Sequence, residues 1–173
     1  MNQIFPMLSV LLLTACQTMP KPPLTVVPQV DLPRFMGDWY VIASIPTFME
    51  KGAHNAVESY RLDTDGTIAV NFTFRKDSFD GKQKQHQPRG FVIDGTGNAV
   101  WGMRFIWPFK ADYRITYVDA SYTQTIISRE ARDYVWIMAR TSTIAAAEYE
   151  HLVGLVAAQG YEIAKLQRVP QQW

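Results

Sequence analysis

Residues 37–45 have the sequence GDWYVIASI and begin a series of short segments rich in β-branched and aromatic residues. Such residues fit the pleated, half-buried surface of a β-strand, and no proline interrupts this segment. Because successive side chains of a strand point to opposite faces, Trp39, Val41 and Ala43 share one face. The stretch is therefore predicted to be a strand, and if Trp39 points inward, Val41 and Ala43 do so as well.

Seven further segments of this kind follow toward the C-terminus. They lie at residues 54–62, 67–75, 83–93, 98–106, 112–119, 123–129 and 133–140. Asp65-Gly66 and Asp94-Gly95-Thr96-Gly97, between these segments, are typical of tight turns in which glycine supplies a positive φ. Strands that recur about every 8–12 residues favour an all-β fold over alternating strands and helices. Eight strands joined in order predict an antiparallel up-and-down β-barrel.

The pattern changes after residue 143. Between residues 144 and 159 the apolar side chains recur at the spacing of a helix that packs on one face, at Tyr149, Leu152, Val153 and Val156. Gly160 follows at a position where helices commonly end with glycine. We expect one C-terminal α-helix packed outside the barrel, and then a short last strand at about residues 161–167.

The alternation of up and down strands decides which loops lie together. With strand 37–45 running up, Trp39, the turn from Asp119 to Tyr122 and Arg140 fall at one end of the barrel. The loops at the opposite end carry a small excess of cations, and the side chains there that would reach a ligand are Lys51, His54 and Lys110. This excess is either an ordinary solvated rim or a feature that favours an anionic head group.

Three motifs at the first end resemble those of the lipocalin family. Gly37-Asp38-Trp39-Tyr40 is similar to the family's G-x-W motif, and Asp119-Ala120-Ser121-Tyr122 resembles its second motif, without the threonine of the commoner form. Arg140 resembles the third motif, the arginine that ends the eighth strand. The resemblance covers about residues 31–169 and is greatest to lipocalins of the bacterial outer membrane. It implies the same barrel, helix and last strand.

The resemblance also implies how the barrel is closed. In lipocalins this arginine packs over this tryptophan, and a guanidinium over an indole contributes about 0.5–2 kcal/mol. We therefore expect a structural role for a closing set that comprises Gly37, Trp39, Asp119, Tyr122 and Arg140. Since the chain has one cysteine, it lacks the disulfides of many animal lipocalins, and the barrel depends on packing and sheet closure.

That cysteine, Cys16, lies between an apolar run and a proline-rich stretch. Residues 4–13 are almost wholly apolar but too short to span a bilayer, which needs roughly 20 residues. Residues 1–15 are therefore predicted to be an export signal. Leu13-Thr14-Ala15-Cys16 resembles a bacterial lipobox, which implies a signal peptide of the lipoprotein type and acylation of Cys16. By the same resemblance, Gln17 suggests lipid anchoring at the outer membrane of a Gram-negative bacterium.

Half of the chain's prolines lie within residues 17–34. We therefore expect residues 16–34 to be the lipidated cysteine and an extended linker, which would hold the barrel on the order of 50 Å from the membrane. The expected lipocalin domain then covers residues 35–169, and residues 170–173 form a C-terminal tail.

The inward faces of the predicted strands offer an apolar interior. By the period of two, the expected ligand pocket consists of Tyr60, Phe72, Phe74, Trp101, Met103, Tyr113, Ile115, Trp136 and Met138. Eight strands leave room either for one small ligand or for side chains that fill the barrel. Glu58 shares a strand face with Tyr60, so it is either partly buried inside the barrel or solvated on its outer surface.

These two interiors lead to two functions. With a cavity, the resemblance implies an outer-membrane-anchored lipocalin that binds or transports fatty acids or lysophospholipids, with a role in the storage or maintenance of envelope lipids. With a filled barrel, the protein is a structural or interaction lipoprotein of the envelope without a lipid ligand. The sequence leaves open whether the chain forms a homodimer.

Signals for catalysis and for metal binding are lacking in the sequence. His54, His86 and His151 fall on separate elements without the spacing of metal ligands, and no serine lies in a G-x-S-x-G motif. The formal net charge is +1, whereas a nucleic-acid-binding protein needs a concentrated basic face. We therefore expect a protein that is not an enzyme and that has no metal, no other cofactor and no nucleic-acid partner.

Overall fold

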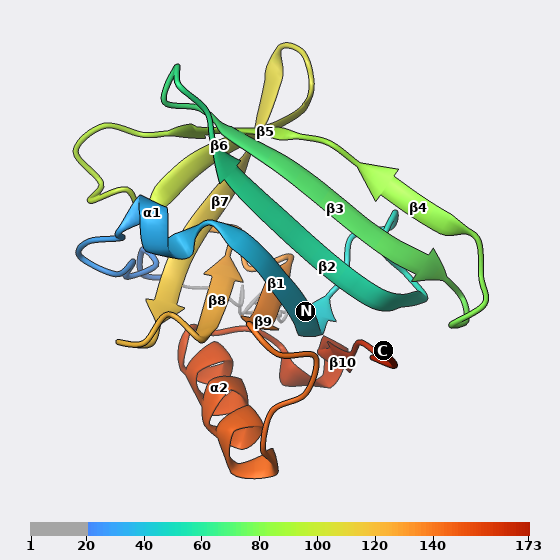
Figure 1. The fold of residues 1–173 in the computed structure, drawn as a ribbon. Helices are drawn as coiled ribbons and strands as arrows, with labels where there is room; N and C mark the ends of the chain where they lie inside the picture. Colours follow the sequence, from blue (N-terminus) through green and yellow to red (C-terminus); the bar gives the residue numbers. More distant parts are fainter. Residues whose placement is uncertain (1–20) are drawn as a thin grey trace, which may run out of the picture.

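The strands of the protein form a closed antiparallel β-barrel with a helix on its outside (Figure 1). The structure is a computed structural model that describes residues 21–173. Its elements are α1 (Leu32–Phe35), β1 (Gly37–Ile45), β2 (Ala53–Leu62), β3 (Ile68–Lys76), β4 (Gln83–His86), β5 (Arg89–Val92), β6 (Val100–Ile106), β7 (Phe109–Val118), β8 (Gln124–Ser128), β9 (Val135–Ala139), α2 (Ala146–Ala158), a 3₁₀ turn (Ile163–Lys165) and β10 (Gln167–Arg168). None of the helices within the described residues is long and apolar enough to cross a bilayer.

The predicted barrel is confirmed. Strands β1 to β9 pair in chain order, except that β4 and β5 share one position beside β3, which leaves eight positions around the barrel. The barrel closes where β1 pairs with β9, from Tyr40 opposite Ala139 to Ile45 opposite Val135. Closure matters because it removes the unpaired edges that an open sheet would expose.

The segment predicted as one strand at residues 83–93 is two strands. Pro88 has no backbone N–H, so the ladder is interrupted there. Both halves keep the same register, because β4 places His86 opposite Phe72 and β5 places Gly90 opposite Ile68. The carbonyl of Pro88 still accepts a hydrogen bond from the Val70 N–H at 3.2 Å. The break therefore leaves the strand's place in the barrel unchanged.

Strand β7 begins at Phe109 instead of residue 112 and so replaces most of the loop expected at residues 107–111, whereas β6 ends at Ile106 as predicted. Ile106 pairs with Phe109, so the turn consists of Trp107 and Pro108. Figure 1 shows this hairpin at the top of the view. The side chains of Ile106, Trp107 and Phe109 at its tip are exposed.

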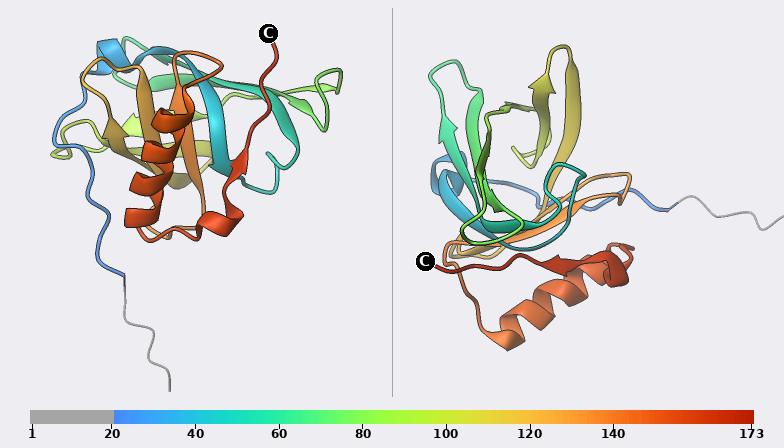
Figure 2. Two further views of the ribbon diagram at one scale, coloured as in Figure 1. Left: turned by 90° about the horizontal axis from the view of Figure 1, so that it is seen from below. Right: turned by 90° about the vertical axis from the view of Figure 1, so that its right-hand side faces the viewer.

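The predicted C-terminal helix is confirmed and covers one outer side of the barrel (Figure 2). Leu152 and Val156 are fully buried in a hydrophobic cluster with residues of β1, β8 and β9. The helix begins two residues later than expected, and its start is held by the Glu148 carboxylate, which accepts the Ala145 N–H at 3.1 Å. Gly160 ends it with a φ of +86°, in the left-handed region that favours glycine.

The expected last strand at residues 161–167 is reduced to β10. Its two residues pair with Ala43 and Ser44 of β1, and a 3₁₀ turn, Ile163–Lys165, lies in the rest of the expected range. The reason lies in β1, which pairs with β2 only from Gly37 to Tyr40. Beyond Tyr40 the strands diverge, and β10 covers the short edge that is left open.

One end of the barrel is closed by Arg140 and Trp39. The Arg140 guanidinium carbon lies 3.8 Å from the centre of a ring of the fully buried Trp39 side chain. The guanidinium also donates hydrogen bonds of 2.8 Å to the carbonyl oxygens of Arg34, Met36 and Asp38. It thus ties the chain that enters β1 to the end of β9. The contact expected from the sequence is present, with more hydrogen bonds than the motif indicates.

Two of the remaining residues of the closing set, Asp119 and Tyr122, lie in the adjacent turn, and Gly37 begins β1. The Asp119 carboxylate accepts the backbone N–H groups of Thr123 and Gln124, each at 2.6 Å. Burial raises the pKa of Asp119, but these hydrogen bonds outweigh it and leave the pKa below its usual value. The Tyr122 hydroxyl accepts the Asp31 N–H at 2.9 Å, and Gly37 has a φ of +91°, which glycine adopts without strain.

The predicted linker is wrong from Leu24 onward. Leu24 and Val30 are buried, the Val27 N–H donates to the Ile115 carbonyl at 3.0 Å, and helix α1 places Phe35 in the core. The prolines keep this segment extended but leave its apolar side chains free to pack. The segment therefore packs on the barrel instead of forming a free spacer between the barrel and the membrane. We call residues 24–31 the N-terminal strap. The expected signal peptide and Cys16 lie outside the described residues.

We expect Arg140→Ala to lower the free energy of unfolding by about 2–3 kcal/mol, because it removes the cation–π contact and several charge-assisted hydrogen bonds at once. Urea denaturation followed by far-UV circular dichroism measures this change. The matched control is Arg61→Ala, since the Arg61 side chain is 76% exposed and makes a surface ion pair with Asp63. That variant should change stability by at most about 0.5 kcal/mol. Equal stability of both variants would contradict the closing role of Arg140.

Candidate ligand-binding site

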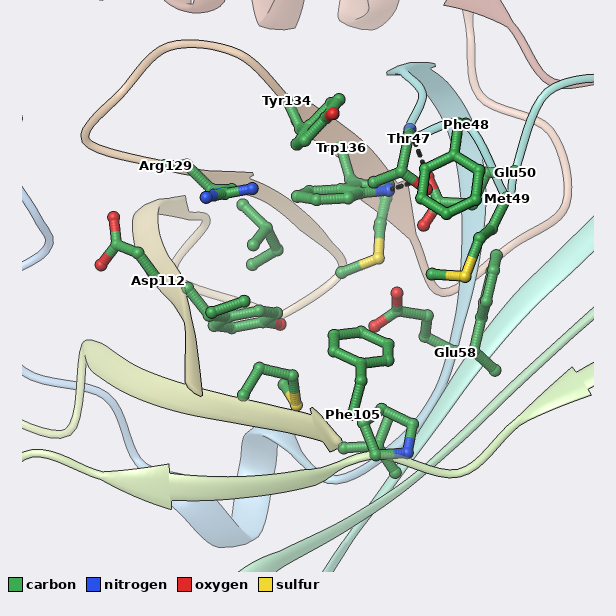
Figure 3. Close-up of a pocket in the computed structure, with 18 residues that line it drawn as sticks. Thr47, Phe48, Met49, Glu50, Glu58, Phe105, Asp112, Arg129, Tyr134 and Trp136 are labelled. Carbon is green, nitrogen blue, oxygen red and sulfur yellow. Dashed lines mark hydrogen bonds between the residues drawn. The ribbon is translucent and has the colours of Figure 1, made fainter. Parts of the chain in front are cut away.

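A cavity of about 200 Å³ lies in the end of the barrel opposite Arg140. Figure 3 shows the side chains that line it. Strands β2, β3 and β6 to β9 form its walls, and the loops after β1 and β8 border it. It is lined by Thr47, Phe48, Met49, Glu50, Glu58, Val70, Phe72, Pro88, Met103, Phe105, Ala111, Asp112, Tyr113, Ile127, Arg129, Tyr134, Trp136 and Met138. Most of these side chains are apolar, as in pockets for small organic ligands.

The alternation of the strands explains this lining. Met103 and Phe105 of β6, and Trp136 and Met138 of β9, are two residues apart and point to the same face of the sheet. Five of the nine residues expected in the pocket lie here. They are Phe72, Met103, Tyr113, Trp136 and Met138.

The other four expected residues are buried but do not line the cavity. Tyr60, Trp101 and Ile115 lie toward the closed end, in a packed layer that they form with Phe35 and Trp39. The Trp101 ring stacks on Tyr113 with centroids 4.8 Å apart, and it is nearly perpendicular to the Phe35 ring, with centroids 5.6 Å apart. This layer fills the closed half of the barrel, so the cavity is shallower than the sequence suggested.

Phe74 is the fourth residue outside the lining. Its ring lies 5.3 Å from Phe72 and is covered by His86 of β4 at 6.1 Å. It therefore supports the wall that Phe72 forms without facing the cavity.

Glu58 points into the cavity, which resolves the alternative that the sequence left open (Figure 3). Its carboxylate accepts a hydrogen bond from the Tyr60 hydroxyl, which in turn is 2.8 Å from the Tyr113 hydroxyl. Burial raises the pKa of Glu58 to about 7, against the lowering effect of the Tyr60 hydrogen bond, and the nearby Glu50 raises it further. Near neutral pH the carboxyl group is thus partly protonated.

A second carboxylate, that of Glu50, borders the cavity on the loop after β1. It accepts hydrogen bonds from the Trp136 indole N–H at 3.1 Å and the Thr47 N–H at 3.2 Å (Figure 3). Burial raises the pKa of Glu50 despite these hydrogen bonds. The Glu50 contact fixes the orientation of the Trp136 ring, because an indole N–H has a single donor direction.

The cation at the cavity is Arg129, which the sequence reasoning did not propose as a ligand contact. It follows Ile127 by two residues, so the strand alternation was the signal that would have found it. One of its nitrogens pairs with Asp133 at 3.3 Å, and its buried Nε has no hydrogen-bond partner among the described residues. The polar lining of the cavity therefore has groups of both signs.

The side chains expected near a ligand lie elsewhere. Lys51, His54 and Lys110 are absent from the lining of the described cavity. The Lys110 ammonium is 3.9 Å from the centre of the Phe91 ring, and the His54 ring packs edge-on against Phe79 at 5.0 Å. In the part of the chain that the structure describes, no group of three His, Asp or Glu side chains is placed to hold a metal ion.

An antiparallel barrel closed at one end, with an apolar cavity at the other, is the architecture typical of binding proteins for small hydrophobic ligands. The chain belongs to the lipocalin family, since the family model of the lipocalin-like domain matches residues 30–171. This membership groups it with binding and transport proteins rather than with enzymes.

Relatives of known name agree with this assignment. The chain is 32% identical to temperature-induced lipocalin-1 of Arabidopsis thaliana, with 87% of this chain and 84% of that protein covered. It is 28% identical to outer membrane lipoprotein Blc of Escherichia coli K12, over 92% of this chain and 90% of that protein. Among solved structures, insecticyanin of the tobacco hornworm Manduca sexta has a similar fold, with a TM-score of 0.67, 14% identity and coverage of 86% and 84%.

The raised pKa of Glu58 predicts that the stability of the protein depends on pH. Its folded value of about 7 is above its usual value of 4.5, so the folded state binds the proton more tightly than the unfolded state. The resulting stabilisation is complete below pH 4.5 and is lost as pH rises through 7. Relative to Glu58→Gln, the free energy of unfolding of the parent protein should fall by about 1–3 kcal/mol between pH 5 and pH 8.

Denaturant titrations at several pH values measure this difference. Glu150→Gln is the matched control, because it removes the same charge from an exposed position on α2. The control should keep the pH dependence of the parent protein. Identical pH profiles for Glu58→Gln and the parent would show that Glu58 is freely solvated.

Proposed function

We propose that the protein binds and carries fatty acids or lysophospholipids through an acyl chain inserted into the cavity. The observation that carries this proposal is the apolar lining of the open half of the barrel, which includes Met103, Ile127 and Met138. Transfer of an acyl chain from water is favourable by roughly 0.8 kcal/mol per CH₂. Methionine side chains adapt to chains of different shape, which suits a carrier of varied lipids.

The polar end of such a ligand belongs at the mouth. The layer of Tyr60, Trp101 and Ile115 stops the chain at the closed end, and the cavity of about 200 Å³ is small for a drug-sized pocket. The head group of a long chain therefore lies near the loops, where Arg129 provides a charge for a carboxylate or a phosphate.

The closed half of the barrel supports the alternative of a filled barrel, and the open half supports a cavity. Side chains fill the closed half as the second hypothesis required, whereas the open half contains the cavity. A structural lipoprotein without a ligand would have no need of an apolar cavity that opens to solvent, because such a surface costs free energy in water. The cavity thus favours the binding function.

We also propose that the protein is anchored to the outer membrane through acylated Cys16. The lipobox-like sequence before this residue supports the anchor, and the similarity to outer membrane lipoprotein Blc supports the location. A protein held in this way is placed to exchange lipids with the membrane, and a role in the storage or maintenance of envelope lipids follows from that position.

Binding should strengthen with chain length until the cavity is filled. Isothermal titration calorimetry with saturated fatty acids of increasing length, and with a lysophospholipid, should show the dissociation constant falling about fourfold per added CH₂ and then levelling off. Trp136→Ala should weaken binding about tenfold, because it removes one cavity wall. Trp173→Ala is the control, since this residue is 70% exposed and outside the cavity. Affinity that is independent of chain length would refute the proposal.

Cys16→Ser should abolish membrane anchoring and the mass of the acyl groups. Fractionation of cells that express either form, followed by mass spectrometry of the purified N-terminus, measures both effects. Acyl-dependent anchoring requires two or more chains, so partial acylation should also reduce membrane retention. Retention of the serine variant in the outer membrane would exclude Cys16 as the anchor.

A further inference from the structure

Glu58 is the polar group of the cavity that an inserted acyl chain does not explain. Its carboxylate projects among apolar side chains, and Figure 3 shows it on the side opposite Arg129. A carboxyl group in such surroundings needs hydrogen-bond partners, because burial without them costs free energy. The residue therefore points to a polar group in the natural ligand.

The hydrogen bonds around Glu58 satisfy only part of the acceptor capacity of its carboxylate. Tyr113 and Tyr60 form a chain of hydroxyl groups that leads to Oε2 of Glu58. Within residues 21–173 no donor is bonded to Oε1, and no cation forms an ion pair with the carboxylate. A carboxylate has about four acceptor sites, so acceptor capacity remains on the side that faces the cavity.

We infer that the inserted chain of the ligand carries a hydroxyl group that donates a hydrogen bond to Glu58. This inference rests on the proposed binding of acyl chains and specifies which of them the site prefers. The ligand class is an acyl chain with an anionic head group at the mouth and a hydroxyl group along the inserted part.

A hydroxyl group suits this position better than a charged group does. It donates to the ionised carboxylate and both donates to and accepts from the protonated form, so either state of Glu58 binds it. A carboxylate on the inserted chain would be repelled by Glu58 and Glu50. An ammonium group would have to lose its hydration in an apolar cavity that also contains Arg129.

The separation of the two polar contacts gives the site a means of selection. The head group is held near Arg129 at the mouth, and Glu58 lies on the opposite side of the cavity (Figure 3). Only a hydroxyl group at a matching position along the chain reaches Glu58 while the head group stays in place. Sites that hydrogen-bond a ligand hydroxyl reject the analogue that lacks it, because their own polar group is then left unpaired.

The test is a calorimetric titration of the parent protein with dodecanoic acid and with dodecanoic acids that carry one hydroxyl group at successive chain positions. We expect one position, or two adjacent ones, to bind about tenfold more tightly than the plain acid. The remaining positional isomers should bind more weakly than the plain acid, because their hydroxyl groups are buried without a partner.

Variants at Glu58 attribute this preference to its carboxyl group. Glu58→Leu should lose the preference for the hydroxylated isomer and bind it no more tightly than the plain acid. Glu58→Gln keeps an acceptor and should retain part of it. Glu150→Gln, on the exposed face of α2, should behave like the parent protein.

The outcomes separate this inference from the function on which it rests. Equal affinity of the parent protein for plain and hydroxylated acids would overturn the inference and leave acyl-chain binding intact. A preference that survives Glu58→Leu would also overturn it. If none of the acids binds, the proposed function fails, and the inference fails with it.

Discussion

The stacking of the Arg140 guanidinium on the Trp39 indole is the contact on which closure of the barrel depends. The same guanidinium donates hydrogen bonds to carbonyl oxygens of the chain that enters β1. Strand β1, the end of β9 and helix α1 therefore meet at one cation. Helix α1 in turn brings Phe35 onto Trp39 and Trp101, with ring centroids 5.1 Å and 5.6 Å apart. The residues that close the barrel are therefore continuous with the packed layer inside it. This layer forms the inner end of the cavity.

Local sequence features predicted the strands and the helix because their causes are local. Alternation, turn glycines and the helical stripe of Leu152 and Val156 act over a few residues, and the resulting elements are present. Proline was less easily interpreted. Pro88 interrupts a strand without moving it, whereas the prolines before residue 34 accompany a segment that packs on the barrel. Whether an extended segment is free or docked depends on the surface it meets, which the sequence does not display.

The candidate site shows the same division. Strand alternation identified the inward faces of Met103, Trp136 and Met138, but not their height along the barrel axis. That height separates residues that line the cavity from those of the packed layer, and it follows from strand tilt and from the intrusion of Phe35. The sequence left the location of Glu58 open, inside the barrel or on its outer surface, because a carboxylate on an inward face contradicts the usual polarity pattern. Sites that break this pattern are where a ligand's own polar group is to be sought.

The path of the N-terminal strap determines where the proposed tether leaves the barrel. The Leu24 N–H donates to the Glu130 carboxylate at 3.2 Å, and the Lys21 ammonium donates to the Gly160 carbonyl at 2.9 Å. Both contacts lie beside the loop after β8, which borders the cavity. From Lys21 back to Cys16 the chain reaches at most ~18 Å, instead of the span expected of a free linker. An acyl group on Cys16 would therefore be a short tether, and the mouth of the barrel would stay close to the lipid surface.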